Sequence, residues 1–249
     1  IWVQVLAFLL ILVGYWGAFA LYPLPGADFD WSQTGVSADW EHNATGLAAH
    51  WNKNTNLAWA FDRWFLNLFP REKPFEYNGG GYATLSFIPT LATMILGLIA
   101  GEVLRRDSAR WQKVLGFIVA GGVMLAAAWV LNEYGICPSV KRIWTPTWVL
   151  ASGGWCLLLL AGFYTVIDWI GLRSWAFPLA VIGMNSIAAY CMAGLWEGFV
   201  SRNLHTHFGH APFELLGEAY VPLMHGAAVL LCFWLILYWM YRQKIFIRI

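Results

Sequence analysis

Charged residues are scarce in this sequence. Only 12% of its 249 residues are Asp, Glu, Lys or Arg, whereas 59% are hydrophobic. A soluble domain of this length would carry roughly a quarter charged residues. The net charge is +1, so nothing points to a nucleic-acid partner. We therefore expect an integral membrane protein that binds no nucleic acid.

Cysteines and the familiar catalytic motifs are equally sparse. Three of the four cysteines, Cys156, Cys191 and Cys232, lie inside apolar runs, and no pair has the spacing of metal ligands. The sequence supports neither a disulfide nor a zinc site. It contains no glycine-rich phosphate loop, nucleophile elbow or HExxH motif. It opens without the basic segment of a signal peptide, and we expect it to begin partway through a longer protein.

Long apolar stretches are abundant instead. A helix needs about 20 mostly apolar residues to cross a bilayer. Six stretches of the sequence meet this requirement, and they are residues 1–22, 83–104, 111–132, 146–167, 176–198 and 219–241. They predict an all-α fold, a polytopic transmembrane helix bundle forming one domain over 1–249. Small residues at 97–101, 121–122 and 152–154 predict close contacts between the second, third and fourth helices.

Basic residues predict the orientation of the bundle. The short link 105–113 and the C-terminal tail 242–248 are rich in Lys and Arg. With six spans they fall on the same side, which the positive-inside rule assigns to the cytoplasm. The loops 24–82, 133–145 and 199–218 would then lie outside the cytoplasm.

The 24–82 loop is too long for a simple connector, so we expect it to be structured. Asn56 can cap a helix that runs to Phe69, and such an amphipathic segment would lie in the plane of the membrane interface. Asp62 and Arg63 are neighbours on this helix and cannot face each other, so at least one should have another partner or meet a substrate. The many aromatic residues of the loop could bind sugar rings or only seat the loop on the bilayer.

The stretch from Cys137 to Leu150 places Lys141 and Arg142 directly before Trp144, at the mouth of the fourth span. A basic pair in this position is either a membrane anchor or part of a binding site. The expected topology puts the two cations on the outer side, where positive charge is not expected. The residues alone leave both interpretations open.

Polar groups inside a span cost on the order of 3 kcal/mol and usually face the interior of the bundle. Asn185 in the fifth span either clamps helices together or holds a polar group of a substrate. His225 in the sixth span either packs or binds. His205, His207 and His210 in the 199–218 loop have metal-like spacing, but no carboxylate or cysteine joins them, so we interpret this segment as a solvated loop without a metal.

A series of different short motifs extends along nearly the whole chain. They are Gly14-Tyr15-Trp16 with Pro23-Leu24-Pro25-Gly26, Asn56-Leu57-Ala58 with Asp62-Arg63, residues 81–89 with Leu96-Gly97 and Ala100-Gly101, residues 141–145, Phe177-Pro178 with residues 183–186, and residues 241–246. In this order they resemble the heparan-α-glucosaminide N-acetyltransferase family of membrane acyltransferases and its bacterial relatives.

This resemblance implies that an acetyl group moves from acetyl-CoA on the cytosolic side to an amino sugar or related glycan on the opposite side. The family's catalytic histidine would precede Ile1, so no catalytic residue is expected in this chain, His42 and His50 included. The phosphates of CoA need cations, and Arg105 and Arg106 could supply them, although the positive-inside bias also explains these residues. No metal is expected. The residues expected to bind the acceptor are Asp62, Arg63, Lys141, Trp144, Asn185 and His225.

The expected function is therefore that of a membrane-embedded acyltransferase fragment, inactive by itself. Two alternatives stay open: a transporter or carrier for sugars or lipid-linked sugars, and a polytopic scaffold without catalysis. The expected partners are the lipid bilayer and a glycan acceptor, and the chain could form a homodimer. The resemblance implies a bacterial inner (plasma) membrane as the location.

Overall fold

The computed structural model describes residues 1–247, and this range is helical without any β-strand. The predicted all-α class is confirmed. The helices group into two compact units, Ile1–Thr165 (unit 1) and Val166–Ile249 (unit 2). The assignment of one domain over 1–249 stays a prediction.

Within residues 1–247, five helices are long and apolar enough to cross a membrane, and a bent pair of helices would make a sixth span. The protein is therefore an integral membrane protein with a polytopic helical bundle. The five helices are α1 (Trp2–Ala20), α3 (Phe87–Arg105), α4 (Arg110–Glu133), α5 (Pro146–Tyr164) and α10 (Val221–Arg242).

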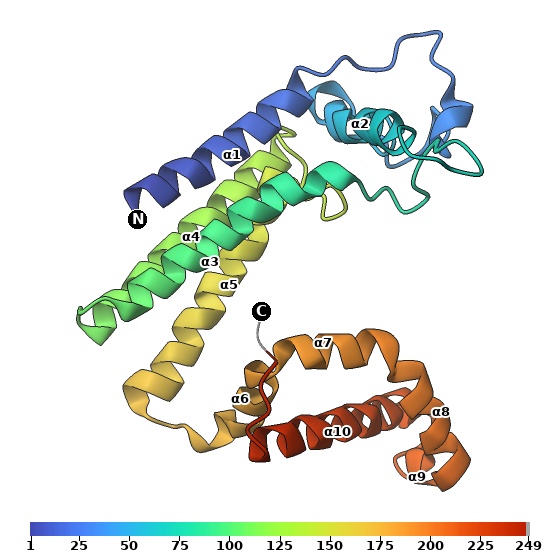
Figure 1. Ribbon diagram of the computed structural model, residues 1–249. Helices are drawn as coiled ribbons and strands as arrows, with labels where there is room; N and C mark the ends of the chain where they lie inside the picture. Colours follow the sequence, from blue (N-terminus) through green and yellow to red (C-terminus); the bar gives the residue numbers. More distant parts are fainter. Residues whose placement is uncertain (248–249) are drawn as a thin grey trace. The chain divides into compact units, whose positions relative to one another are not determined.

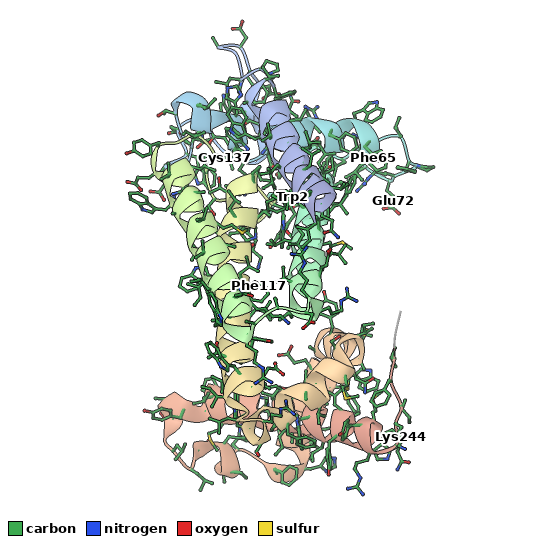
Figure 2. All side chains as sticks on the ribbon, turned by 90° about the vertical axis from the view of Figure 1, so that its left-hand side faces the viewer. Trp2, Phe65, Glu72, Phe117, Cys137 and Lys244 are labelled. Carbon is green, nitrogen blue, oxygen red and sulfur yellow. The ribbon has the colours of Figure 1, made fainter. Side chains whose placement is uncertain are left out.

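Unit 1 is a bundle of α1, α3, α4 and α5, with loops and short helices gathered at one end (Figure 1). We call residues 21–86 and 134–145 the end cap. A buried cluster joins the end cap to the helices and contains Tyr15, Phe19, Trp51, Cys137 and Ile143. Figure 2 labels Cys137 at this end and Phe117 further along α4. The cluster fixes the end cap on the ends of the helices.

Glycines let α4 and α5 approach closely. A Cβ atom on Gly121 would lie 2.9 Å from the carbonyl oxygen of Gly154, which confirms the predicted contact between the third and fourth spans. In the predicted stretch 97–101 of α3, Ala100 packs against α4 and α5, whereas Cβ atoms on Gly97 and Gly101 would have no neighbour within 4 Å. The small residue that makes the contact is therefore Ala100 rather than the two glycines.

The end cap contains the helix predicted after Asn56. It is α2 (Leu57–Leu66), and the Asn56 side chain accepts a hydrogen bond from the Trp59 backbone N–H at 3.1 Å. The helix ends at Leu66 rather than Phe69. The other short elements of the end cap are the 3-10 helices η1 (Trp31–Thr34), η2 (Gly46–Trp51) and η3 (Thr84–Ser86).

The buried amide of Asn54 ties three segments of the long loop together. Asn54 has a φ of 55°, and its Nδ2 donates to the carbonyl oxygens of Thr34 at 2.7 Å and Asn78 at 3.1 Å. Three segments far apart in sequence are thereby tied at one point. This confirms that the loop is structured.

Unit 2 is built around α10. The remaining elements are a π-helical segment (Thr165–Ile170) that begins at the unit boundary, η5 (Ser174–Ala176), α6 (Phe177–Met184), α7 (Ser186–Leu195), α8 (Glu197–Phe208), α9 (Ala211–Glu214) and η6 (Glu218–Tyr220). The core of the unit contains Val181, Met192, Val229, Phe233 and Leu237.

One expectation for unit 2 was wrong, and another stays a prediction. The predicted fifth span is a helix pair, α6 and α7, that bends by 71° because Asn185 has non-helical angles (φ −132°, ψ 43°), and it is a sixth span if the two halves cross together. The predicted 199–218 loop is largely helical. Val200 and Leu204 of α8 pack against the core, so tertiary packing stabilises a helix that its polar sequence does not predict.

Candidate functional site

A cleft of about 280 Å³ lies in the end cap of unit 1. Its walls come from three segments: residues 40–56, Gly81 and residues 138–143. Indole, imidazole, cationic and amide side chains line it. They belong to Trp40, Trp51, His42, Lys53, Arg142, Asn52 and Asn56.

The two principal cations of the cleft lie over aromatic rings. The Lys53 ammonium lies 5.5 Å from the centre of the Trp40 ring, and the Arg142 guanidinium lies 5.8 Å from that of Tyr82. Within residues 1–247, neither cation forms a salt bridge with a carboxylate. Their positive charge is therefore available to a ligand.

Trp51 brings an unused hydrogen-bond donor to the wall of the cleft. The residue is 3% exposed, and its ring stacks on Phe19 with the planes 8° apart. Its indole Nε1–H is buried without a hydrogen-bond partner in the described chain. A buried unpaired donor costs about 1–3 kcal/mol, so an acceptor group that reached it would be stabilised.

Asp62 borders a small second cavity next to the cleft. This cavity, of about 10 Å³, shares the lining residues Asn56, Gly81 and Ile143 with the cleft. Asp62 is 4% exposed, and its two carboxylate oxygens accept from the Thr84 backbone N–H at 3.0 and 3.2 Å. The volume holds about one water-sized group, such as a hydroxyl or an amine.

The turn before α5 separates Trp144, which was predicted to bind the acceptor, from Arg142, which the predicted acceptor residues did not include. Trp144 has a φ of 51°, and its Nε1–H donates to Thr93 Oγ1 at 3.1 Å while the ring packs against the Phe8–Leu12 cluster within the bundle. Arg142, two residues earlier, lines the cleft. The left-handed residue thus directs the indole into the bundle and leaves the guanidinium at the cleft.

The remaining predicted residues of unit 1 have different surroundings. Lys141 is exposed on the same turn and does not line the cleft. Arg63 lies 4.9 Å from the centre of the Trp59 ring, whereas Asp62 bonds to backbone. The adjacent acid and base of α2 therefore have separate partners, as their positions on a helix require.

Asn185 uses both ends of its side chain on the C-terminal segment. It is fully buried. Its Nδ2 donates to the Ile245 carbonyl oxygen at 3.0 Å, and its Oδ1 accepts from the Ile247 N–H at 3.0 Å. This pairing favours a structural clamp over a contact with substrate.

His225 belongs to a cluster of imidazoles in unit 2. Its ring stacks on His205 with centroids 4.4 Å apart, and His210 lies 4.6 Å from His205. The sequence spacing grouped His207 with His205 and His210, and only the packing of α8 on α10 brings His225 to them. Among residues 1–247 no group of three His, Cys, Asp or Glu side chains has a geometry that could hold a metal.

Cys137 lies in the turn between the cleft and the helices. All four cysteines are free thiols. Burial raises the pKa of the Cys137 thiol, and hydrogen bonding to Thr147 only partly opposes this. A thiol held in its neutral form is a weak nucleophile, so the residue is part of the buried cluster rather than a catalytic group.

Arg105 and Arg106 lie at the end of α3 opposite the end cap and are exposed. Arg105 Nε donates to the Gly101 carbonyl oxygen at 3.3 Å. Lys113 is buried, and its Nζ donates to the Leu104 carbonyl oxygen at 2.7 Å. Lys113 of α4 therefore holds the end of α3 by a hydrogen bond, whereas the side chains of Arg105 and Arg106 are exposed to solvent.

Comparisons with known proteins identify no family. A scan against models of protein families and a search of curated proteins each found no match for this chain. The resemblance to the acyltransferase family stays a prediction that rests on the short motifs.

The groups of the cleft have a definite chemistry. Indole faces stack on the C–H faces of sugar rings, while cations and N–H donors bind hydroxyl, carboxylate or phosphate oxygens. Trp40, Trp51, Lys53 and Arg142 supply all of these within one cavity. The cleft is therefore suited to a ring-shaped ligand with oxygen acceptors such as hydroxyl, carboxylate or phosphate groups.

Proposed function

We propose that this chain is the acceptor-binding part of a membrane-embedded acyltransferase that transfers an acetyl group from acetyl-CoA to an amino sugar. The observation that carries the proposal is the cleft of unit 1, where two indoles line one cavity together with two cations that have no carboxylate partner within residues 1–247. The ordered motifs shared with the acyltransferase family support the same reaction.

The two ends of unit 1 suit two substrates. The cleft lies in the end cap, and Arg105 and Arg106 lie at the other end of α3. In this proposal the end cap faces outward from a bacterial inner membrane and binds the sugar. The arginines face the cytoplasm and contact the phosphates of CoA.

The reaction forms a C–N and an S–H bond and breaks a C–S and an N–H bond. The amine nitrogen of the sugar attacks the thioester carbonyl carbon, the C–N bond forms, and the C–S bond breaks. CoA leaves as a thiolate and takes up the proton that the amine loses. The residues of this chain orient the acceptor: Trp40 stacks on the sugar ring, and the Asp62 carboxylate accepts a hydrogen bond from an amine or hydroxyl in the small cavity.

The test uses the protein with its expected upstream region, reconstituted in vesicles. We expect labelled acetyl-CoA, supplied on the side of Arg105 and Arg106, to acetylate glucosamine on the opposite side. The 249-residue chain alone should give no transfer, because the resemblance places the catalytic base upstream. Absence of transfer to any amino sugar by the longer protein would overturn the proposal.

A carrier for sugars or lipid-linked sugars is a second candidate. The broken α6–α7 pair is the observation that favours it, since discontinuous helices form binding sites in transporters. Uptake of a labelled amino sugar into vesicles without acetylation would favour the carrier. Acetylation without net uptake of free sugar would favour the enzyme.

A further inference from the structure

An apolar groove of about 370 Å³ runs along α1 in unit 1. Its lining residues come from α1, the end of α4, the turn that follows and the first turns of α5, and they are Leu9, Leu12, Val13, Trp16, Leu131, Ile136, Cys137, Pro146 and Leu150. The one N–H donor among these side chains, the Trp16 indole, already bonds to the Ile136 carbonyl oxygen at 2.9 Å. The groove thus offers a surface for hydrocarbon and no hydrogen bond.

The groove lies at the depth of one leaflet. Pro146 is the first residue of α5, and Leu150 follows one turn later. At 1.5 Å per residue these positions are within about 6 Å of the helix end. The groove therefore lies where acyl chains of the leaflet next to the end cap would be.

The groove and the cleft are adjacent along the chain. Ile136 and Cys137 line the groove, and Pro138 lines the cleft. At the cleft, Lys53 and Arg142 have no carboxylate partner within residues 1–247. A second apolar groove, of about 310 Å³, borders α1 on the side of α2 and α3 and also adjoins the cleft along the chain, since its Leu57 follows Asn56. The first groove, on the side of α4 and α5, is the larger of the two and leads to the turn that carries Arg142.

We propose that the ligand of the cleft is anchored to a lipid. Its phosphate group binds between Lys53 and Arg142, its sugar contacts the indoles, and its hydrocarbon chain lies in the groove along α1. This inference rests on the proposed function and makes the acceptor an amino sugar joined to a lipid through phosphate. The two cations favour an anionic phosphate head group, and the apolar lining of the groove favours the hydrocarbon chain of the lipid.

Photolabelling of the reconstituted protein tests the inference. Phosphatidylcholine nanodiscs would carry either phosphatidic acid or phosphatidylcholine with the same diazirine-bearing acyl chain, and labelled residues would be mapped by mass spectrometry. We expect phosphatidic acid to label the groove about fivefold more than phosphatidylcholine, the ratio that roughly 1 kcal/mol of attraction to a cation gives.

Matched variants separate the site from bulk lipid. Lys53→Gln with Arg142→Gln should remove the preference for phosphatidic acid, and Val13→Trp should block labelling of the groove. Lys73→Gln, at an exposed cation of the end cap, and Leu10→Trp, in the second groove, should leave both unchanged. Equal labelling by the two lipids would identify the groove as an ordinary lipid contact and overturn the inference. Absence of labelling in the groove would mean that protein covers it, with the same consequence.

A soluble ligand distinguishes this inference from the proposed function. Glucosamine 6-phosphate carries the sugar, amine and phosphate without the chain. If it is acetylated as efficiently as its lipid-linked form, and the groove shows no head-group preference, the lipid inference fails and the acyltransferase stands. If neither acceptor is acetylated, the proposed function fails whatever the labelling shows.

Discussion

Side chains of the end cap bond to backbone groups more than to one another. Asn54 holds the carbonyl oxygens of Thr34 and Asn78, and Asp62 holds the N–H of Thr84. These bonds satisfy polar backbone groups that irregular structure leaves unpaired. They therefore fix the walls of the cleft without a sheet or a long helix.

Asn185 has a comparable role in unit 2, where it holds the C-terminal segment. We predict that Asn185→Leu leaves the Ile245 carbonyl and the Ile247 N–H without their partner and destabilises this region by about 1–3 kcal/mol. The measurement is amide hydrogen exchange of residues 243–247 in detergent. Ser186→Leu, at the exposed neighbouring position, is the control.

The clamp role and a substrate role for Asn185 lead to different results. A clamp predicts faster exchange in the C-terminal segment of Asn185→Leu and little change in Ser186→Leu. Unchanged exchange with loss of acetyl transfer would show instead that the amide meets the substrate.

The imidazole cluster makes the stability of unit 2 depend on pH. Partial burial, followed by the neighbouring His225 and His210, lowers the pKa of His205, and a bond to the Gly209 backbone only partly opposes this. A lowered pKa in the folded state means that the unfolded chain binds more protons, so stability is highest above the unfolded pKa near 6.5 and falls as the pH drops below it.

We therefore predict a lower melting temperature at pH 5 than at pH 7.5, with part of the difference due to His205. His205→Gln should reduce this pH dependence, because it removes the group whose protonation is opposed. His207→Gln, at an exposed residue outside the cluster, should retain it. An identical pH dependence in His205→Gln and the wild type would contradict this account.

At the scale of elements, the close packing of α4 and α5 depends on Gly121. A Cβ atom there would meet the Gly154 carbonyl oxygen at 2.9 Å, whereas a Cβ on Gly122 would have no neighbour within 4 Å. We predict that Gly121→Ala destabilises unit 1 by about 1–3 kcal/mol through overpacking. Gly122→Ala should be neutral or stabilising by about 0.5–1 kcal/mol, because alanine favours a helix. Unfolding in mixed micelles measures both, and equal effects would contradict the packing.

Hydropathy predicts the long helices well, because an apolar run of the right length has few alternatives in a membrane protein. The predicted span 111–132 is α4 (Arg110–Glu133), and 219–241 is α10 (Val221–Arg242). The bend at Asn185 and the helix α8 were missed. Both depend on tertiary partners: the C-terminal segment for Asn185 and the core around α10 for α8.

The candidate site is only partly visible in the sequence. Arg142 and the aromatic loop residues were recognised as possible ligands; Arg142, Trp40 and Trp51 line the cleft, whereas Trp31, Trp59 and Trp64 do not. Lys141, predicted beside Arg142, does not line it either. Lys53 carried no local signal, since its place at the cleft depends on contacts with segments far away in sequence. Trp144 was expected to face substrate, but a single left-handed residue in the turn directs its ring into the bundle.

At the scale of the whole molecule, unit 1 has a polar end cap at one end of its helices and a basic link at the other. This arrangement allows a reaction between substrates on the two sides of a membrane. We infer that the cleft binds the acceptor sugar of such a reaction, and this inference is central to the proposed function. Trp40 is the residue to change, because it lines the cleft and is expected to stack on the sugar.

The most direct measurement is the rate of acetyl transfer to glucosamine by vesicles containing the protein with its expected upstream region. We predict that Trp40→Ala lowers kcat/KM about tenfold, mainly through KM, because a lost stacking contact of this kind corresponds to roughly 1.4 kcal/mol. Trp64→Ala removes an exposed indole of α2 that does not line the cleft and should leave kcat/KM unchanged. Equal kcat/KM values for Trp40→Ala and Trp64→Ala would contradict the claim that the cleft binds the acceptor.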